Sequence, residues 1–386
     1  MAAEQKESRL SLKLLIDEKS NRVVAAEAHK EFVEILFSFL TLPMGTIIGV
    51  TSSGDTKTPV TTIGCLNNLY RAVEKLSNEN WETENCKTMV LRPRNPLGDY
   101  CQKLKMNIDE SWSNTCFRCY CCRSRFSCEI DGIREMLVEV SKEQVICLLA
   151  HSLVSVSPLT DVFLPNPKKH QRKLPKPKTE RTLQTTEQND APTPTLNLQV
   201  TLNKSTNNIL FAKATNEFFD FLCTFLIIPI GSIIHVLKRN RGGFGGCIYN
   251  LYTSVEELED KWFGSCLKSA ILNPQIAQYH NCKKQPLKLD EHIESDILLD
   301  PRPNQNFAAE PSLFVVLDNL DVKPLSSASS FIILRELKVL FSDVEDQVIT
   351  VGMNEALSLL KAALTSPSSA LTNGLASFLQ KNKQEA

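Results

Sequence analysis

Internal duplication is the feature that most constrains how this chain can fold. Residues 12–50 align without a gap onto residues 198–236 at a constant offset of 186, with 14 identities in 39 positions. Unrelated segments of this composition would share about two or three. The match resumes at residues 64–70 and 246–252, and again near the ends of the copies. The chain therefore contains two copies of one domain.

The duplication predicts the domain organisation. We expect a first copy at residues 9–164, a linker at 165–195, a second copy at 196–379 and a polar tail at 380–386. The linker holds six prolines and almost no large apolar residue, so it cannot bury enough surface to order itself. The first copy carries a cysteine-rich insertion at 101–128, but it lacks a counterpart of residues 314–341 and is apparently truncated, by about fifty residues on comparison of the two repeats.

Hydrophobic periodicity predicts an α+β fold in each copy. Two short apolar runs separated by polar turn residues indicate an opening β-hairpin. Apolar residues at 3.6 spacing then indicate a buried helix, which Pro43 or Pro229 breaks. The expected elements are hairpins at 11–28 and 197–214, helices from Phe32 and Phe218, second helices at 65–76 and 247–258, short strands at 89–91 and 270–272, and amphipathic helices at 143–153 and 354–364.

Two apolar stretches, residues 32–50 and 218–236, approach the ~20 residues of a membrane-spanning helix. Each is interrupted by its proline and carries an acid near one end, Glu34 or Asp220. A buried helix followed by a turn is the better interpretation, so we expect no membrane span.

Several of these motifs are similar to a known family. The segments at 11–17, 36–47, 64–70, 159–163, 317–326 and 355–364 resemble the plant-specific domain of unknown function 674 family. The resemblance covers both copies, and it implies a land-plant origin and tandem domains. It implies no activity, because the family has none to transfer. Family members typically carry further cysteines beside a glycine where this chain reads Ile130-Asp131-Gly132.

The cysteine-rich insertion is the sharpest chemical feature. Cys116 and Cys119 are spaced so that one tight turn can present two thiolates to a zinc ion, and Cys122 (or Cys121) with Cys128 could complete a tetrahedron. The ligands are crowded, however, and no histidine lies nearby. A structural zinc site at Cys116, Cys119, Cys122 and Cys128 competes with free thiols and, less strongly, with redox chemistry. Cys65 and Cys247 occupy matching helical positions and are expected to be core residues.

Phosphate-binding and catalytic signals are weak. The linker run Lys168–Lys178 is basic, which suits a spacer, a nuclear-import signal or phosphate contacts, but no aromatic residue is interleaved for base stacking. The glycines at 242–246 lack the spacing of a nucleotide loop and indicate a flexible turn. Neither a His-Glu-x-x-His pair nor a Gly-x-Ser-x-Gly elbow occurs in the sequence.

Composition adds little to this interpretation. The chain has 43 Lys and Arg against 44 Asp and Glu, a net charge of −1, so no global field draws it to nucleic acid or membranes. The odd count of 13 cysteines and the polar start predict a protein of the cytoplasm or nucleus. The sequence favours a non-catalytic interaction or regulatory module with an unknown protein partner. An enzyme with a site assembled from distant residues, or a nucleic-acid-associated protein, is the alternative.

Overall fold

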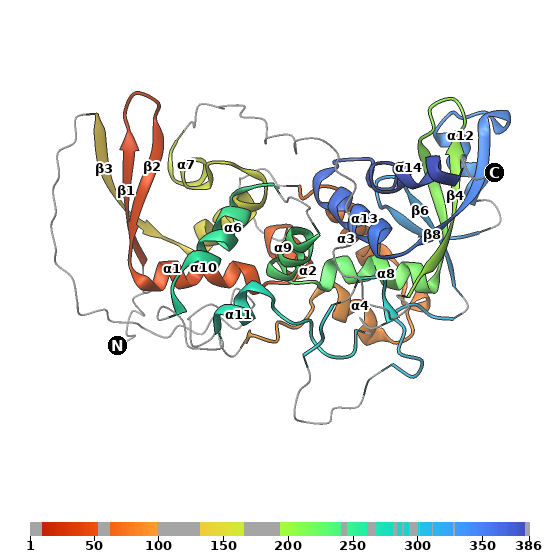
Figure 1. Cartoon of the computed structure of the whole chain (residues 1–386), viewed down its shortest axis with the longest axis horizontal. Coiled ribbons are helices and arrows are strands. Elements are labelled where there is room, and N and C mark those ends of the chain that lie inside the picture. The colour runs from red at the N-terminus through yellow and green to blue at the C-terminus, as the bar shows by residue number, and fades with distance from the viewer. Residues whose placement is uncertain are drawn as a thin grey trace, which may run out of the picture.

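The computed structural model describes residues 10–52, 62–98, 132–165, 194–240, 245–260, 267–280, 284–287, 289–292, 300, 302–310, 312–326 and 329–382. These residues form two β-sheets and a set of helices, so the predicted α+β class is confirmed. The sheets lie at opposite ends of an elongated molecule, with helices between them (Figure 1).

Both sheets are antiparallel. In the first, β1 (Leu10–Asp17) pairs with β2 (Arg22–Ala28) on one side and β3 (Ile133–Val140) on the other. The second sheet has five strands in the order β7-β6-β5-β4-β8. Its strands are β4 (Leu196–Asn203), β5 (Ile209–Thr215), β6 (Leu313–Leu317), β7 (Val322–Pro324) and β8 (Val344–Val351). Strands β4, β5 and β8 occupy the same order as β1, β2 and β3, whereas β6 and β7 belong to the segment without a counterpart among the described residues of the first copy.

The turn of each hairpin uses the same side-chain chemistry. Asn21 and Asn207 occupy the left-handed region with φ of 49° and 57°, which asparagine tolerates better than most residues. Asp17 and Asn203, at the ends of β1 and β4, each accept a hydrogen bond from a backbone N–H in the turn, at 3.1 and 2.9 Å. The copies therefore share a side-chain oxygen at this position, and a negative charge is not required.

A threonine fastens each hairpin to the C-terminal part of its own copy. Both hairpins have a register shift, and next to it a strand N–H is free to bond elsewhere. Val23 N donates to Thr160 Oγ1 at 3.1 Å, and Ile209 N donates to Thr372 Oγ1 at 2.9 Å. This explains why Thr160 and Thr372 match in the two copies.

The helices are divided between the two copies. Apolar residues on one face of α1 and on nearly all sides of α8 drive both helices into the interior. The first copy contains α1 (Lys30–Ser38), η1 (Phe39–Thr41), α2 (Met44–Ser52), α3 (Leu66–Lys75), η2 (Asn78–Asn80), α4 (Glu84–Leu91), α6 (Lys142–Val154) and α7 (Pro158–Phe163). The second contains α8 (Asn216–Ile227), α9 (Ile230–Arg239), α10 (Cys247–Glu257), α11 (Leu267–Leu272), α12 (Ser329–Glu336), η5 (Phe341–Asp343), α13 (Met353–Thr365) and α14 (Ala370–Asn382).

The two copies cross at their matched prolines. Pro43 and Pro229 face each other in an antiparallel bridge. Met44 N donates to Ile228 O and Ile230 N donates to Leu42 O, both at 3.1 Å. A proline has no N–H, so in each segment the residue after the proline donates a hydrogen bond and the residue before the proline accepts one.

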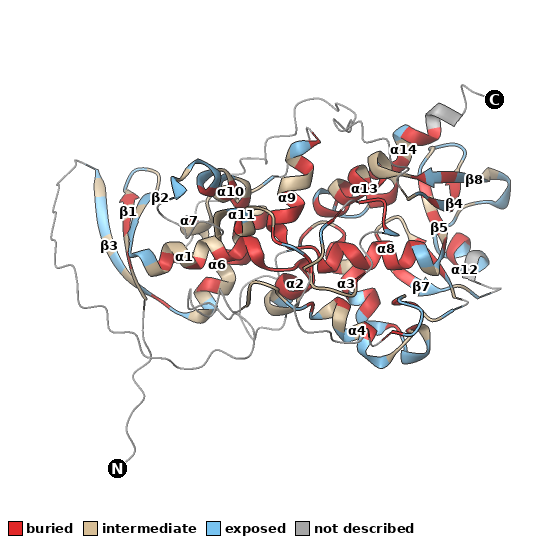
Figure 2. Ribbon diagram, turned by 60° about the horizontal axis from the view of Figure 1, so that its bottom comes forward, coloured by how far each residue is buried: buried red, intermediate tan, exposed pale blue. Residues whose placement is uncertain are grey.

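Beyond this crossing, the copies exchange helices. Helices α3 and α4 of the first copy pack on α8 of the second, while α10 and α11 of the second pack on α1 and η1 of the first. Figure 1 shows the exchange by colour, because the orange α4 lies beside the light-green α8 and the green α10 lies beside the red α1. One hydrophobic cluster accordingly contains residues of both copies, from Leu12 to Leu379. Figure 2 shows that its buried helices run through the middle of the molecule.

Two glycines allow the exchanged helices to approach the other copy. Gly64 and Gly246 precede α3 and α10 with positive φ of 49° and 93°. A Cβ atom at Gly64 would lie 2.3 Å from Ala363 O, and one at Gly246 would lie 2.6 Å from Leu153 O. The glycine before α10 is therefore explained by close packing against the end of α6, as its counterpart is against α13.

Two expected elements differ. The short strands predicted at residues 89–91 and 270–272 are wrong, because these residues end helices α4 and α11. In α4, the buried residues Cys86 and Val90 are four positions apart, which is helical spacing. The three residues 89–91 alone are too few to show this spacing. Within the described residues, no helix is long and apolar enough to cross a membrane.

Candidate functional site

The predicted metal site cannot be located in the structure. Cys116, Cys119, Cys122 and Cys128 lie outside the described residues, as does the basic run Lys168–Lys178. Across the described ranges, no group of three or more His, Cys, Asp or Glu residues is placed to hold a metal ion. The cysteine cluster as a zinc site therefore stays a prediction.

The expectation that the matched cysteines are core residues is confirmed for Cys65 and not for Cys247. Cys65 is fully buried and its thiol donates to Ser366 O at 3.0 Å, while Cys247 is only partly buried. Burial raises the pKa of Cys65 to about 11 and that of Cys247 above its usual value. Both thiols are thus held in the unreactive protonated form at neutral pH.

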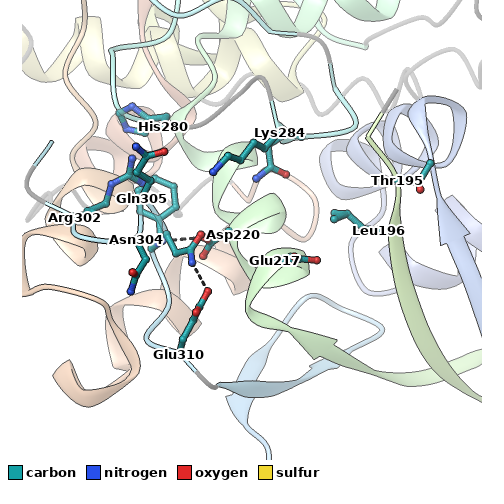
Figure 3. Close-up of a pocket in the computed structure, with 13 residues that line it drawn as sticks. Thr195, Leu196, Glu217, Asp220, His280, Lys284, Arg302, Asn304, Gln305 and Glu310 are labelled. Carbon is teal, nitrogen blue, oxygen red and sulfur yellow. Dashed lines mark hydrogen bonds between the residues drawn. The ribbon is translucent and has the colours of Figure 1, made fainter. Parts of the chain in front are cut away.

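A polar pocket of about 410 Å³ in the second copy is the strongest candidate site. We call it the Arg302 pocket. Figure 3 shows that its wall combines the N-terminal half of α8, the start of β4 with Thr195 before it, His280 and Lys284, and the segment 302–310. The lining residues are Thr195, Leu196, Glu217, Asp220, His280, Lys284, Gln285, Arg302, Asn304, Gln305, Asn306, Phe307 and Glu310.

Asp220 anchors the wall of the pocket from α8. Its side chain is 5% exposed, and its two carboxylate oxygens accept hydrogen bonds from Phe307 N at 2.9 Å and Ala308 N at 3.0 Å. Burial raises the pKa of Asp220 to about 7, although the two N–H donors oppose this by favouring the charged form. The carboxyl group therefore holds a segment more than eighty residues away in the sequence.

Arg302 is a buried cation among the residues that line the pocket. Its side chain is fully buried, and Nε and Nη2 donate to the two oxygens of Asp300 at 3.1 Å each. The guanidinium also lies over the ring of Phe307, 4.8 Å from its centroid. Nη1 makes no hydrogen bond within the described part of the chain. An unsatisfied buried donor costs about 1–3 kcal/mol, more when charged, so it marks a place where a further group is expected.

His280 and Gln285 bring two more such atoms to the same wall. The His280 ring is 3% exposed, and Nδ1 donates to Ala277 O at 2.7 Å, which leaves Nε2 as an acceptor. Burial lowers the pKa of His280, so the ring is neutral. Among the described residues, neither His280 Nε2 nor Gln285 Oε1 has a partner.

The first copy supports the pocket from outside. Glu82 accepts hydrogen bonds from Asn304 N and from Asn306 N, the second at 2.8 Å. Its own backbone N–H donates to Phe307 O at 2.9 Å, and Trp81 forms an isolated bridge with Ala308. The exchange of helices therefore places a carboxylate of one copy behind the binding wall of the other.

The ionisable side chains deep in the pocket are already held by neighbouring groups. Asp220 accepts two backbone N–H groups, Arg302 is clamped by Asp300, and His280 is fixed by a carbonyl. Within the described lining, no hydroxyl or thiol is hydrogen-bonded to a histidine or carboxylate that could activate it. The rim supplies Glu217, Glu310 and Lys284 with the carboxamide of Asn304, groups that recognise a ligand by charge and hydrogen bonds.

A second cavity, of about 530 Å³, lies between the copies and is lined by residues of both, including Leu97, His235 and Tyr252. Two pairs of its polar side chains lie within hydrogen-bonding distance of each other. His235 Nδ1 lies 3.1 Å from Tyr252 Oη, and His292 Nδ1 lies 3.1 Å from Gln275 Oε1. It offers a ligand fewer unmet hydrogen bonds than the Arg302 pocket does.

Sequence reasoning did not find the Arg302 pocket. Asp220 stood out as an acid within an apolar stretch, and this was the available signal. Arg302, His280 and Gln285 belong to no motif, because their positions relative to α8 arise from long-range packing.

A family model described as a protein of unknown function (DUF674) matches residues 6–130 and 123–354. The two matches fit tandem copies of one domain. No curated protein and no solved structure matches the chain.

Proposed function

The chain belongs to the DUF674 family of proteins of unknown function, and we propose that it is a non-catalytic binding module that takes a small polar ligand in the Arg302 pocket. The observation that carries the proposal is that three buried polar atoms of the lining residues, Arg302 Nη1, His280 Nε2 and Gln285 Oε1, have no partner among the described residues. Buried polar atoms are normally satisfied by protein, water or ligand.

The pocket also defines the class of ligand. Its volume of about 410 Å³ lies within the roughly 300–1,000 Å³ of small-molecule sites. Among the described lining residues, Glu217, Asp220 and Glu310 contribute carboxyl groups, against the ammonium of Lys284 and the guanidinium of Arg302, which is already paired with Asp300. We therefore favour a small molecule with several hydrogen-bond donors, such as a polyol, an amino acid or an amine.

A regulatory role follows from the position of the wall. A ligand that bonds to segment 302–310 would act on a segment that Asp220 holds from the second copy and Glu82 holds from the first. Binding can then change how firmly the copies are joined. We propose that this coupling operates in the cytoplasm or nucleus. We also propose that each copy is one repeat of the same architecture, an opening hairpin followed by buried helices.

The experiment is native mass spectrometry of the purified full chain, followed by melting curves with a panel of polyols, amino acids and amines. The variant Asn304→Trp places a large side chain at an exposed position of the lining. Leu137→Trp is the matched control, because Leu137 is 73% exposed and belongs to β3, which lies at the other end of the molecule from β4 (Figure 1). We expect a retained molecule or a raised melting temperature in the wild type and in Leu137→Trp, and neither in Asn304→Trp. A wild type that binds nothing in both assays, or binding that Asn304→Trp leaves unchanged, would contradict the proposal.

A further inference from the structure

The two copies differ at one strand edge. In the second copy, the outer edge of β5 is covered by β6, with Phe211 to Thr215 paired against Leu317 to Leu313. The corresponding strand of the first copy is β2, and within the described residues β2 pairs with β1 alone. Among the described residues, the edge opposite Ala25 to His29 therefore lacks the partner that its counterpart has.

The side chains around this edge are also less buried than their counterparts in the second copy. Ala214 and Phe219 are fully buried in the second copy, and Phe219 stacks on Phe314 of β6 with centroids 4.3 Å apart. Their counterparts at the offset of 186 are Ala28, which is exposed, and Val33 on α1, which is only half-buried. Figure 2 shows exposed residues along β2, where β5 is largely buried.

We infer that the edge of β2, with Val33 beside it, is a docking site for an extended strand supplied by a partner protein. The occupant would pair antiparallel with residues 25–29 and carry large apolar side chains at alternate positions. This chemistry is taken from β6, Leu313-Phe314-Val315-Val316-Leu317, in which Phe314 and Val316 are fully buried. Strand addition at an open edge is a general mode of peptide recognition, in which the backbone gives affinity and alternate side chains give specificity.

The outer face of the first sheet is charged, which fits a partner that binds the edge of β2 without covering this face. Lys13 on β1 bonds to Glu27 at 3.5 Å and to Glu135 at 2.8 Å, so this face is charged. In the second copy, the same face is covered by apolar residues of the extra segment, including Ile333 and Leu334. A partner of the first copy therefore needs to replace β6, and it does not need the helix α12 that follows.

The probe is a fluorescent peptide with the sequence of residues 312–326, which spans β6 and β7, titrated onto the full chain and followed by anisotropy. Val33→Glu places a charge beside the edge, whereas Val348→Glu removes an apolar side chain that is 61% exposed on β8. We expect saturable binding that Val33→Glu weakens by at least about tenfold, or about 1.4 kcal/mol, and that Val348→Glu leaves unchanged. Circular dichroism and melting curves establish that both variants are folded.

A second peptide with Phe314→Glu tests the apolar register and should bind at least about tenfold more weakly. Failure of the wild-type peptide to bind would overturn the inference. Equal binding to Val33→Glu would also overturn it, because the peptide would then be entering the second copy in place of β6. Light scattering that shows a dimer of the chain, lost in Val33→Glu, would assign the edge to a second copy and reject a heterologous partner.

Discussion

At the scale of single residues, the duplication has preserved hydrogen-bonding geometry more closely than charge. Asp17 and Asn203 differ in charge but both supply a side-chain oxygen to the turn. Thr160 and Thr372 both accept from a strand N–H beside a register shift. Asp220 and its counterpart Glu34 show the opposite case. Asp220 is buried against a segment of the second copy, while Glu34 forms an ion pair with Lys30 at 3.4 Å.

Asp220 makes stability depend on pH. Its pKa is raised from 3.8 to about 7 by burial. Between these values, the unfolded chain has lost this proton while the folded chain keeps it, so raising the pH favours unfolding. We expect the Asp220 contribution to be fully present below about pH 4 and to be lost as the pH rises through 7.

The test is urea unfolding at a series of pH values from 4 to 8, with Asp220→Asn compared to the wild type. The difference in unfolding free energy between them should change across this range, with the wild type losing stability as the pH rises. Asp260→Asn is the control, since the side chain of Asp260 is 82% exposed. A wild type that gains stability relative to Asp220→Asn on raising the pH would show that the two N–H donors outweigh burial.

At the scale of elements, the main finding is the exchange of helices after the matched prolines. Helices α3 and α10 are each preceded by a glycine that packs closely against the other copy. Helices α4 and α11 follow them, and α4 packs on α8, which carries Asp220. The exchanged elements therefore connect the shared core to the wall of the Arg302 pocket.

Gly64→Ala tests one of these contacts. The new Cβ atom would lie 2.3 Å from Ala363 O, and φ of 49° is itself unfavourable for alanine. Gly132→Ala is the matched control, because Gly132 also has a positive φ, of 85°, yet a Cβ atom added there would meet nothing within 4 Å. We expect Gly132→Ala to cost about 1–2 kcal/mol of unfolding free energy and Gly64→Ala at least about 2 kcal/mol more. Equal losses would mean that the start of α3 does not pack tightly against α13.

Sequence patterns predicted the local elements better than their arrangement. Apolar residues at 3.6 spacing located α1, α8, α6 and α13, because each of these helices buries one face or more. The third strand of the first sheet, β3, was not predicted, since its exposed Leu137 interrupts the alternation of a half-buried strand. The exchange and the Arg302 pocket leave no local signal in the sequence. The apolar pattern of a helix is satisfied equally whether the helix packs on its own copy or on the other.

At the scale of the whole molecule, the two copies are joined through one hydrophobic cluster. The crossing of Pro43 and Pro229, the exchanged helices and the support of segment 302–310 by Glu82 all depend on this union. The copy boundaries near residues 164 and 196 remain a prediction. The residues before and after these boundaries pack into the same hydrophobic cluster. The copies should consequently stay together when the chain between them is cut.

The most direct measurement is size-exclusion chromatography with light scattering on a chain carrying a specific protease site within residues 166–193, before and after complete cleavage. We expect the two fragments to elute together at the mass of the intact chain in native buffer, and to separate only in denaturant, because α3, α4, α10 and α11 remain packed against the other copy. An uncleaved sample incubated in parallel is the control. Two folded fragments that separate in native buffer would contradict the interlocked architecture of the two copies.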